Sequence, residues 1–104
     1  MIDVMVAYPN KDTLIFDDRY YMEQHVPMVE NRLGEHGLRY ARIHRGIDAS
    51  SPYHLIAHLG FDSPDAFESA FDAVGHQLME DVTRFTNVEP VLQVNEVLIS
   101  NTAS

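Results

Sequence analysis

The chain has 104 residues, a length that suits one compact domain with a single hydrophobic core. Its 16 acidic residues against 7 basic ones give a formal net charge of −9, which argues against binding to nucleic acid or to anionic membranes. Cysteine is absent, so disulfides, thiol nucleophiles and metal–thiolate sites are excluded. No leader opens the chain and no apolar run approaches the ~18 residues that span a bilayer, so we expect a cytoplasmic protein.

The first half of the chain predicts a strand, a long helix and a second strand. Residues 2–8 alternate in character and stop at Pro9-Asn10, which is typical of a strand followed by a turn. Residues 17–36 follow a helical period, with Asp17 or Asp18 as the cap and Gly37 as the left-handed stop. Residues 38–45 then read as a strand. The apolar stripe predicted for the helix is Met22, Val26, Val29 and Leu33.

The second half predicts a strand, one or two helical segments and a last strand. Residues 53–61 alternate as a strand, and Ser63-Pro64 is a strong helix start. A separate, weaker helical piece is expected over 76–85, before a long strand over 88–99. Residues 1–100 thus form one predicted domain, followed by a loose tail at 101–104. The buried stripe predicted for the helix after Ser63 is Phe67, Ala70, Phe71 and Val74.

The order of these elements is strand, helix, strand, strand, helix, strand. It predicts an α+β, ferredoxin-like βαββαβ fold with an antiparallel sheet whose helices cover one face only. The last predicted strand is apolar on both sides, with Val91 on one and Leu92 and Val94 on the other. An uncovered apolar face needs a partner, and we expect a homodimer packed through the exposed sheet face.

The densest group of polar and aromatic residues lies in the first helix, around His25. On a regular helical wheel Tyr21 and His25 fall on the same flank of the apolar stripe, one turn apart. Pro27 cannot donate to the carbonyl of Glu23, which predicts a local helix defect. An imidazole beside a phenol at the edge of a core is suited to relay a proton or to bind a substrate oxygen. The alternative is that both residues only pack.

Two further groups of side chains are expected on the strands. His54 and His58 share one strand face but are too far apart to bind one metal, so we predict no metal site and a structural role. An alternative role is a pH-sensitive interface on that face. Tyr40, Arg42 and His44 point to one side of their strand together and are expected to line the same space.

Two motifs carry a resemblance to a known family. The first is Tyr20-Tyr21 followed by His25-Val26-Pro27-Met28, and the second is the segment 81–87, which runs into residues 89–97. Together they resemble the EthD family, named for ethyl tert-butyl ether degradation, over nearly the whole chain. The resemblance implies a dimeric α+β barrel. It also implies relatives of two kinds, namely accessory proteins of a degradation pathway and cofactor-free enzymes acting on small cyclic or aromatic compounds.

These observations leave three functions open, all built on an apolar pocket near His25. The first is a cofactor-independent isomerase or dehydratase, in which His25 transfers a proton and Tyr21 orients it or the substrate oxygen. The second is a non-catalytic protein that sequesters a small apolar molecule, and the third is a cofactor-less monooxygenase. No cofactor is expected in any of them. The residues expected to line the pocket are Phe16, Tyr21, Met28, Phe67 and Phe71.

Overall fold

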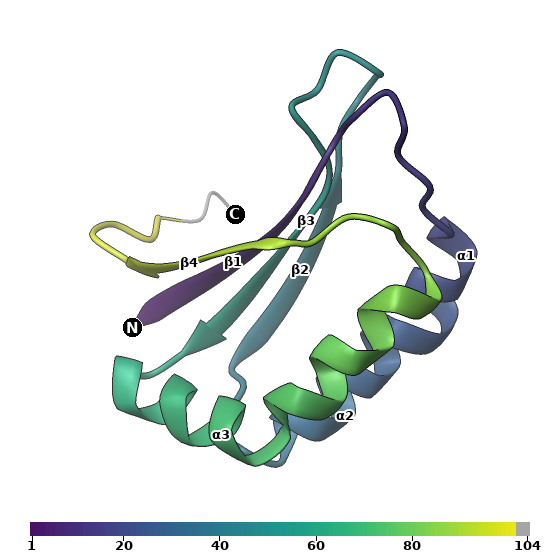
Figure 1. Cartoon of the computed structure of the whole chain (residues 1–104). Helices are drawn as coiled ribbons and strands as arrows, with labels where there is room; N and C mark the ends of the chain where they lie inside the picture. Colours follow the sequence, from purple (N-terminus) through teal and green to yellow (C-terminus); the bar gives the residue numbers. More distant parts are fainter. Residues whose placement is uncertain (102–104) are drawn as a thin grey trace.

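A computed structural model describes residues 1–101 of the chain, in which four strands form one antiparallel sheet. The strand order is β2-β3-β1-β4, and the helices all lie against one face of the sheet (Figure 1). This is the predicted ferredoxin-like α+β fold. The elements, in chain order, are β1 Ile2–Pro9, α1 Asp18–Tyr20, η1 Tyr21–His25, α2 Val26–Gly34, β2 Tyr40–Arg45, β3 Tyr53–Phe61, α3 Pro64–Asp81, η2 Val82–Arg84 and β4 Val91–Glu96. The predicted tail falls outside the described residues from position 102 on.

The first helix contains a π-helical segment, η1, between its two α-helical parts. Its side-chain cap is Asp17, which accepts the backbone N–H of Tyr20 at 3.0 Å, and the backbone N–H of Val26 bonds to the carbonyl of Tyr21. The defect expected near Pro27 therefore takes the form of a wider turn just before it. The extra residue in that turn rotates the part of the helix before it. Met22, which was predicted to lie on the buried apolar stripe, is therefore 48% exposed.

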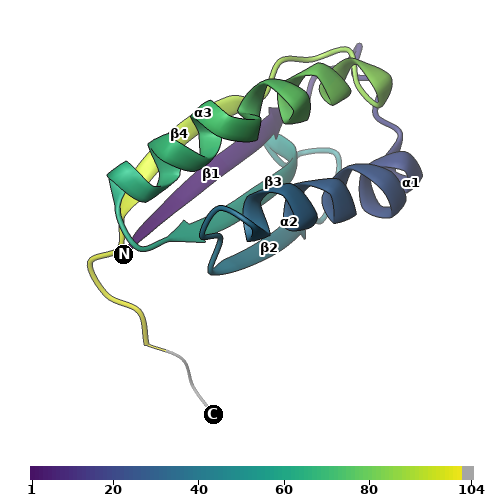
Figure 2. The same cartoon turned by 90° about the horizontal axis from the view of Figure 1, so that it is seen from below.

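Helix α3 is longer than the sequence pattern predicted. It begins where expected, with Ser63 Oγ accepting the backbone N–H of Ala66 at 3.1 Å. The separate helical piece expected over 76–85 does not exist, because α3 runs unbroken to Asp81 and continues as the 3₁₀ turn η2. Helices α2 and α3 lie side by side and antiparallel beneath the sheet (Figure 2).

The strands are confirmed, but two are shorter than predicted. The predicted strand 53–61 matches β3, whereas β2 begins at Tyr40 instead of residue 38. The last strand, predicted over 88–99, is limited to β4, because β4 pairs only with β1 and that neighbour spans the pairing from Ile2 to Ala7.

The core between sheet and helices divides into two clusters. One contains Val4, Leu33 and Phe61, and it fills the layer between the sheet, α2 and most of α3. The second is rich in aromatic rings and lies where η1 meets η2. It is this second cluster that surrounds the candidate site. Its buried members are Tyr8, Tyr21, Leu55, Val82 and Phe85.

The sheet face away from the helices is more polar than predicted. Asp3 accepts the Tyr40 hydroxyl at 2.5 Å, and its other oxygen lies 2.9 Å from His58 Nδ1. The register pairs Leu92 with Val6, and Val94 with Val4, so these two residues lie on the side of the helices, whereas Val91 lies on the bare face. Leu92 and Val94 lie at the sheet edge, where the helix layer leaves them 38% and 49% exposed.

Three side chains of β2 share this bare face, as predicted. The guanidinium of Arg42 lies 5.5 Å from the centre of the Tyr40 ring, and the rings of His44 and His58 are 5.2 Å apart. The Tyr40 ring covers Gly60, where any Cβ would collide with it. The bare face therefore presents an ordered polar network in place of a plain apolar patch.

Candidate functional site

The centre of the candidate site is the imidazole of His25, which is 5% exposed. Its Nδ1 lies 2.9 Å from Oδ2 of Asp81, the last residue of α3. The other oxygen of Asp81 accepts the Tyr20 hydroxyl at 2.8 Å and lies 3.6 Å from Nε of the exposed Arg84. The end of α3 and the π turn of the first helix are thus joined by one buried carboxylate.

These contacts determine which nitrogen of His25 carries the proton. An ionised carboxylate only accepts hydrogen bonds, so the neutral imidazole donates its Nδ1–H to Asp81, and Nε2 is left as an acceptor without a partner among residues 1–101. Burial lowers the pKa of His25 below its ordinary 6.5, and the hydrogen bond and charge of Asp81 oppose that shift in part. His25 is therefore neutral at pH 7, with the protonation state of a general base.

Aromatic rings enclose the imidazole on several sides. The Tyr21 ring stacks on it at 5.3 Å between centres, and the Phe85 ring lies 4.7 Å away. Tyr8 and Phe16 complete the group, each meeting the Tyr21 and Phe85 rings at 5.3–5.8 Å between centres. The rings exclude water from the imidazole, so its interaction with Asp81 takes place in a low dielectric.

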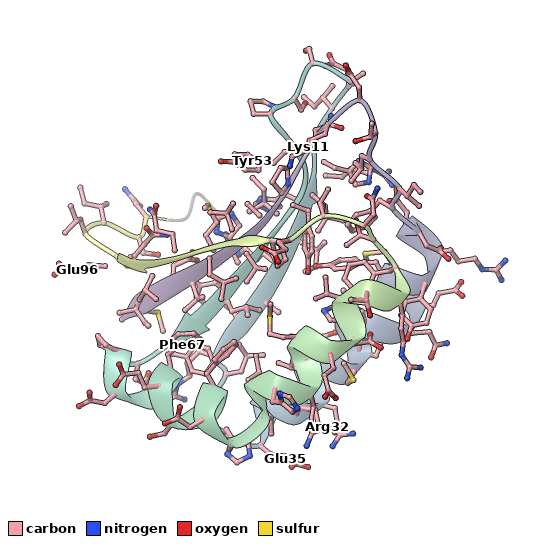
Figure 3. The ribbon with its side chains drawn as sticks, in the orientation of Figure 1. Lys11, Arg32, Glu35, Tyr53, Phe67 and Glu96 are labelled. Atoms are coloured by element: carbon pink, nitrogen blue, oxygen red, sulfur yellow. The ribbon has the colours of Figure 1, made fainter. Side chains whose placement is uncertain are left out.

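A cavity of about 50 Å³ lies next to this group, between the sheet and the helices. Tyr21 and His25 line it, together with Phe67 and Phe71 of α3, and Figure 3 shows Phe67 pointing from α3 toward the sheet. Three of the residues that line it, Glu30, Met79 and Leu92, are also exposed to solvent. Its apolar sheet wall consists of Val4, Val6, Ala41, Ile43, Ala57 and Leu59.

Two of the residues expected in the pocket lie elsewhere. Phe16 is part of the aromatic group and lies against the His54 ring at 4.7 Å between centres, but it is not among the cavity's lining residues. Met28 packs against the first core cluster. The interpretation of both as lining residues is not supported, because the π turn rotates the helix and the loop before it turns Phe16 toward β3.

Two residues that sequence reasoning missed belong to the site. The sequence pattern indicates Asp81 only as part of a helix end, and its partner His25 is 56 residues away. Tyr8 lines the cavity and is 2% exposed. The only sequence signal for Tyr8 is its position in the alternating pattern with Val4 and Val6. This position places Tyr8, with its hydroxyl group, on the core face of the strand.

The two predicted histidines of β3 each contact a separate carboxylate. His54 Nε2 lies 2.7 Å from Asp18, and His58 pairs with Asp3. In the part of the chain that the structure describes, no three acidic or histidine side chains are grouped so as to hold a metal ion. Among residues 1–101, none of the helices combines the length and apolar content that crossing a bilayer requires.

Comparison with known proteins places these features in a family context. The EthD domain model matches residues 15–89, which include His25 and Asp81. An EthD-like protein from Ralstonia eutropha JMP134 superposes with a TM-score of 0.85 at 31% identity, covering 97% of this chain and 95% of its own. An EthD family protein from Bacillus halodurans C-125 gives a TM-score of 0.66 at 18% identity, with coverages of 92% and 97%.

The fold is shared more widely than the sequence. A dimeric ferredoxin-like protein from Thermobifida fusca YX gives a TM-score of 0.55 at 16% identity, covering 89% of this chain and 87% of its own. At this identity the likeness concerns the fold alone. No curated protein matches the sequence at a significant level.

Proposed function

This chain belongs to the EthD family, and we propose that it binds a small apolar molecule beside His25 and moves a proton on it without a cofactor. The observation that carries the proposal is the buried His25–Asp81 pair. In this pair Nδ1 of the imidazole is occupied by Asp81, and His25 is one of the residues that line the apolar cavity, so we propose that Nε2 is the atom that meets the ligand. A residue that only filled space would not need a buried carboxylate to orient it.

The chemistry that suits this arrangement is an isomerisation or a dehydration. In either, His25 Nε2 takes a proton from a carbon next to an electron-withdrawing group, and the C–H electron pair moves into the substrate. In an isomerisation the imidazolium returns the proton to a different carbon. In a dehydration the proton goes to a departing hydroxyl group, which leaves as water. Positioned acid–base help of this kind contributes roughly 10²–10⁴-fold in rate.

Asp81 and Tyr20 are proposed as positioning residues. The carboxylate keeps the imidazole in the tautomer with a free Nε2 and stabilises the imidazolium that forms during the reaction. The hydrogen bond to Asp81 raises the pKa of Tyr20, so its hydroxyl stays protonated and continues to donate. Both oxygens of the Asp81 carboxylate therefore have a hydrogen-bond partner, Tyr20 on one and His25 on the other.

A ring-sized ligand requires some movement of the cavity wall. A dry cavity of ~150 Å³ holds a benzene-sized molecule, and the cavity here measures about 50 Å³. Met79 lines the cavity and is 37% exposed, and a methionine side chain changes rotamer at small cost. We propose that Met79 and Phe71 move apart from Leu92 to admit the ligand.

We also propose that the chain forms a homodimer through the uncovered sheet face. Supporting this, the face carries Met5, Ile56 and Val91 among its polar residues, and Val91 is 44% exposed. The dimeric relative from Thermobifida fusca shares the fold. The ordered Tyr40–Asp3–His58 network is suited to an interface because its polar atoms already have partners when water is removed.

Exchange of α-hydrogens in cyclopentanone tests the proton-transfer proposal. In D₂O, wild-type protein should accelerate the exchange over buffer, as followed by NMR, and His25→Ala should reduce the acceleration by about 100-fold or more. The matched control is His36→Ala, an exposed histidine outside the site, which should leave the rate unchanged. Equal rates for wild type and His25→Ala would refute the role of His25. Binding of the ketone, shown by thermal protection, without any exchange would instead identify a sequestering protein.

A further inference from the structure

Two buried phenols, Tyr8 and Tyr21, open into the same cavity as His25, and we propose that their hydroxyl groups together bind a carbonyl oxygen of the ligand. Each residue is only 2% exposed, and each lines the cavity. They come from different elements, Tyr8 from β1 and Tyr21 from η1, and their rings meet edge to face at 5.8 Å between centres. This inference rests on the proposed function and names the substrate class that it requires.

The hydroxyls of these two residues are available to a ligand. Within residues 1–101, neither forms a hydrogen bond to a protein group, whereas the hydroxyls of Tyr20 and Tyr40 donate to Asp81 and Asp3. No fully occluded side-chain nitrogen or oxygen of the described residues lacks a partner. The Tyr8 and Tyr21 hydroxyls therefore open onto accessible space, and the cavity is the space that both residues line.

Both hydroxyls are donors under ordinary conditions. Burial raises the pKa of Tyr8 and of Tyr21 well above the usual 10, and in Tyr8 the neighbouring Tyr21 and Asp81 add to the shift. These donors have no acceptor in a cavity whose other walls are apolar, so the cavity favours a ligand that brings an acceptor atom. A carbonyl oxygen has two lone pairs and can accept from both hydroxyls at once.

The same geometry has a consequence for the reaction. When His25 takes a proton from the carbon beside a carbonyl, negative charge develops on the carbonyl oxygen as the enolate forms. Two fixed donors at that oxygen stabilise the charge more than they stabilise the neutral ketone. The rest of the wall is apolar, so the ligand class is a small hydrophobic ketone, lactone or quinone.

Binding of two isosteric probes tests the inference. Cyclopentanone and methylenecyclopentane differ only in an oxygen that replaces a CH₂ group. Wild-type protein should bind the ketone about 10-fold more tightly in an NMR titration, and bound ketone should show a carbonyl stretch shifted to lower frequency. Tyr8→Phe and Tyr21→Phe should each reduce the preference several-fold, and the double variant should remove it. Affinity for the hydrocarbon should not change in any of them.

The control variant is Tyr53→Phe, and each outcome of the titration has a separate meaning. Tyr53→Phe removes a phenol that lies far from α3 and its Phe67 (Figure 3), and it should leave the preference for the ketone intact.

Equal affinities of the two probes for the wild type would overturn the inference but would remain consistent with an apolar pocket. A preference for the ketone that persists in the double Tyr→Phe variant would also overturn the inference and remain consistent with an apolar pocket. If neither probe binds, the proposed binding of a small apolar molecule in the cavity is refuted, and so is this inference. A ketone preference combined with no hydrogen exchange would leave the inference intact and refute only the proton transfer.

Discussion

His25 and Asp81 form a buried pair in which imidazole Nδ1 lies 2.9 Å from carboxylate Oδ2, although 56 residues separate them in the chain. Their side chains are 6% and 12% exposed. Helices α2 and α3 lie antiparallel, so the start of the first helix meets the end of the second, and the π turn directs His25 inward at that point (Figure 2). The pair therefore depends on both helices being in place.

The first prediction concerns the titration of His25. Burial holds its pKa below 6.5 and Asp81 opposes this, so Asp81→Asn should lower the pKa further. Proton NMR of the imidazole Cε1–H in both proteins measures the two values. A wild-type His25 that titrates above 6.5 would contradict the assignment of a neutral imidazole.

The same shift makes stability depend on pH in a defined direction. In the unfolded chain His25 takes up a proton near pH 6.5, while the folded protein resists protonation to a lower pH. The contribution of His25 to the free energy of unfolding is thus fully present above pH 6.5. It is lost as the pH falls from 6.5 through the lowered pKa of His25 in the folded protein. Urea unfolding should show a smaller loss of stability between pH 7 and pH 5 in His25→Gln than in the wild type.

The second prediction concerns the volume of the cavity. Ala41 of β2 lines the cavity and is partly buried. Ala41→Val adds two methyl groups in a strand, where a β-branched residue is favoured, so stability should change by less than about 1 kcal/mol. Cyclopentanone affinity should fall by about 10-fold or more, as measured by NMR titration. An unchanged affinity together with an unchanged melting temperature would show that the ligand binds elsewhere.

The third prediction compares two glycines near the end of the first helix. Gly34 ends α2 with open space where a Cβ would lie, whereas Gly37 has φ of +97°, a conformation that L-residues avoid. Gly34→Ala should stabilise the protein by about 0.5–1 kcal/mol. Gly37→Ala should destabilise it by about 1–2 kcal/mol. Chemical denaturation measures both, and equal effects would contradict the assignment of Gly37 as the helix stop.

The fourth prediction concerns the proposed dimer. Ile56 is half-buried on the bare face of β3, opposite the helices, so Ile56→Glu would place an unpaired charge in the interface. Sedimentation equilibrium should show the dimer dissociation constant raised by roughly 100-fold or more. Met22→Glu, at a 48% exposed position on the helix side, is the matched control and should leave the assembly unchanged. A wild-type protein that remains monomeric at micromolar concentration would refute the dimer.

Local patterns were sufficient for the elements and several of their ends. The alternation in residues 53–61, the Ser63-Pro64 start of α3 and the left-handed Gly37 were all predicted and are confirmed. Each depends on neighbouring residues and on backbone preferences that act over a few positions. The pattern failed at Met22, because a single π turn changes the phase of every residue before it.

By itself the sequence determined the order of strands and helices, and it singled out Tyr21 and His25 as a polar pair beside an apolar stripe. Only the tertiary structure decided that Asp81 and Tyr8 join them, and that the bare sheet face carries an ordered polar network. The physical reason is that secondary structure follows from hydrogen bonding and side-chain patterns within one segment. A buried hydrogen bond between a histidine and a carboxylate, or a shared cavity, follows from the packing of segments far apart in the chain, which no local periodicity encodes.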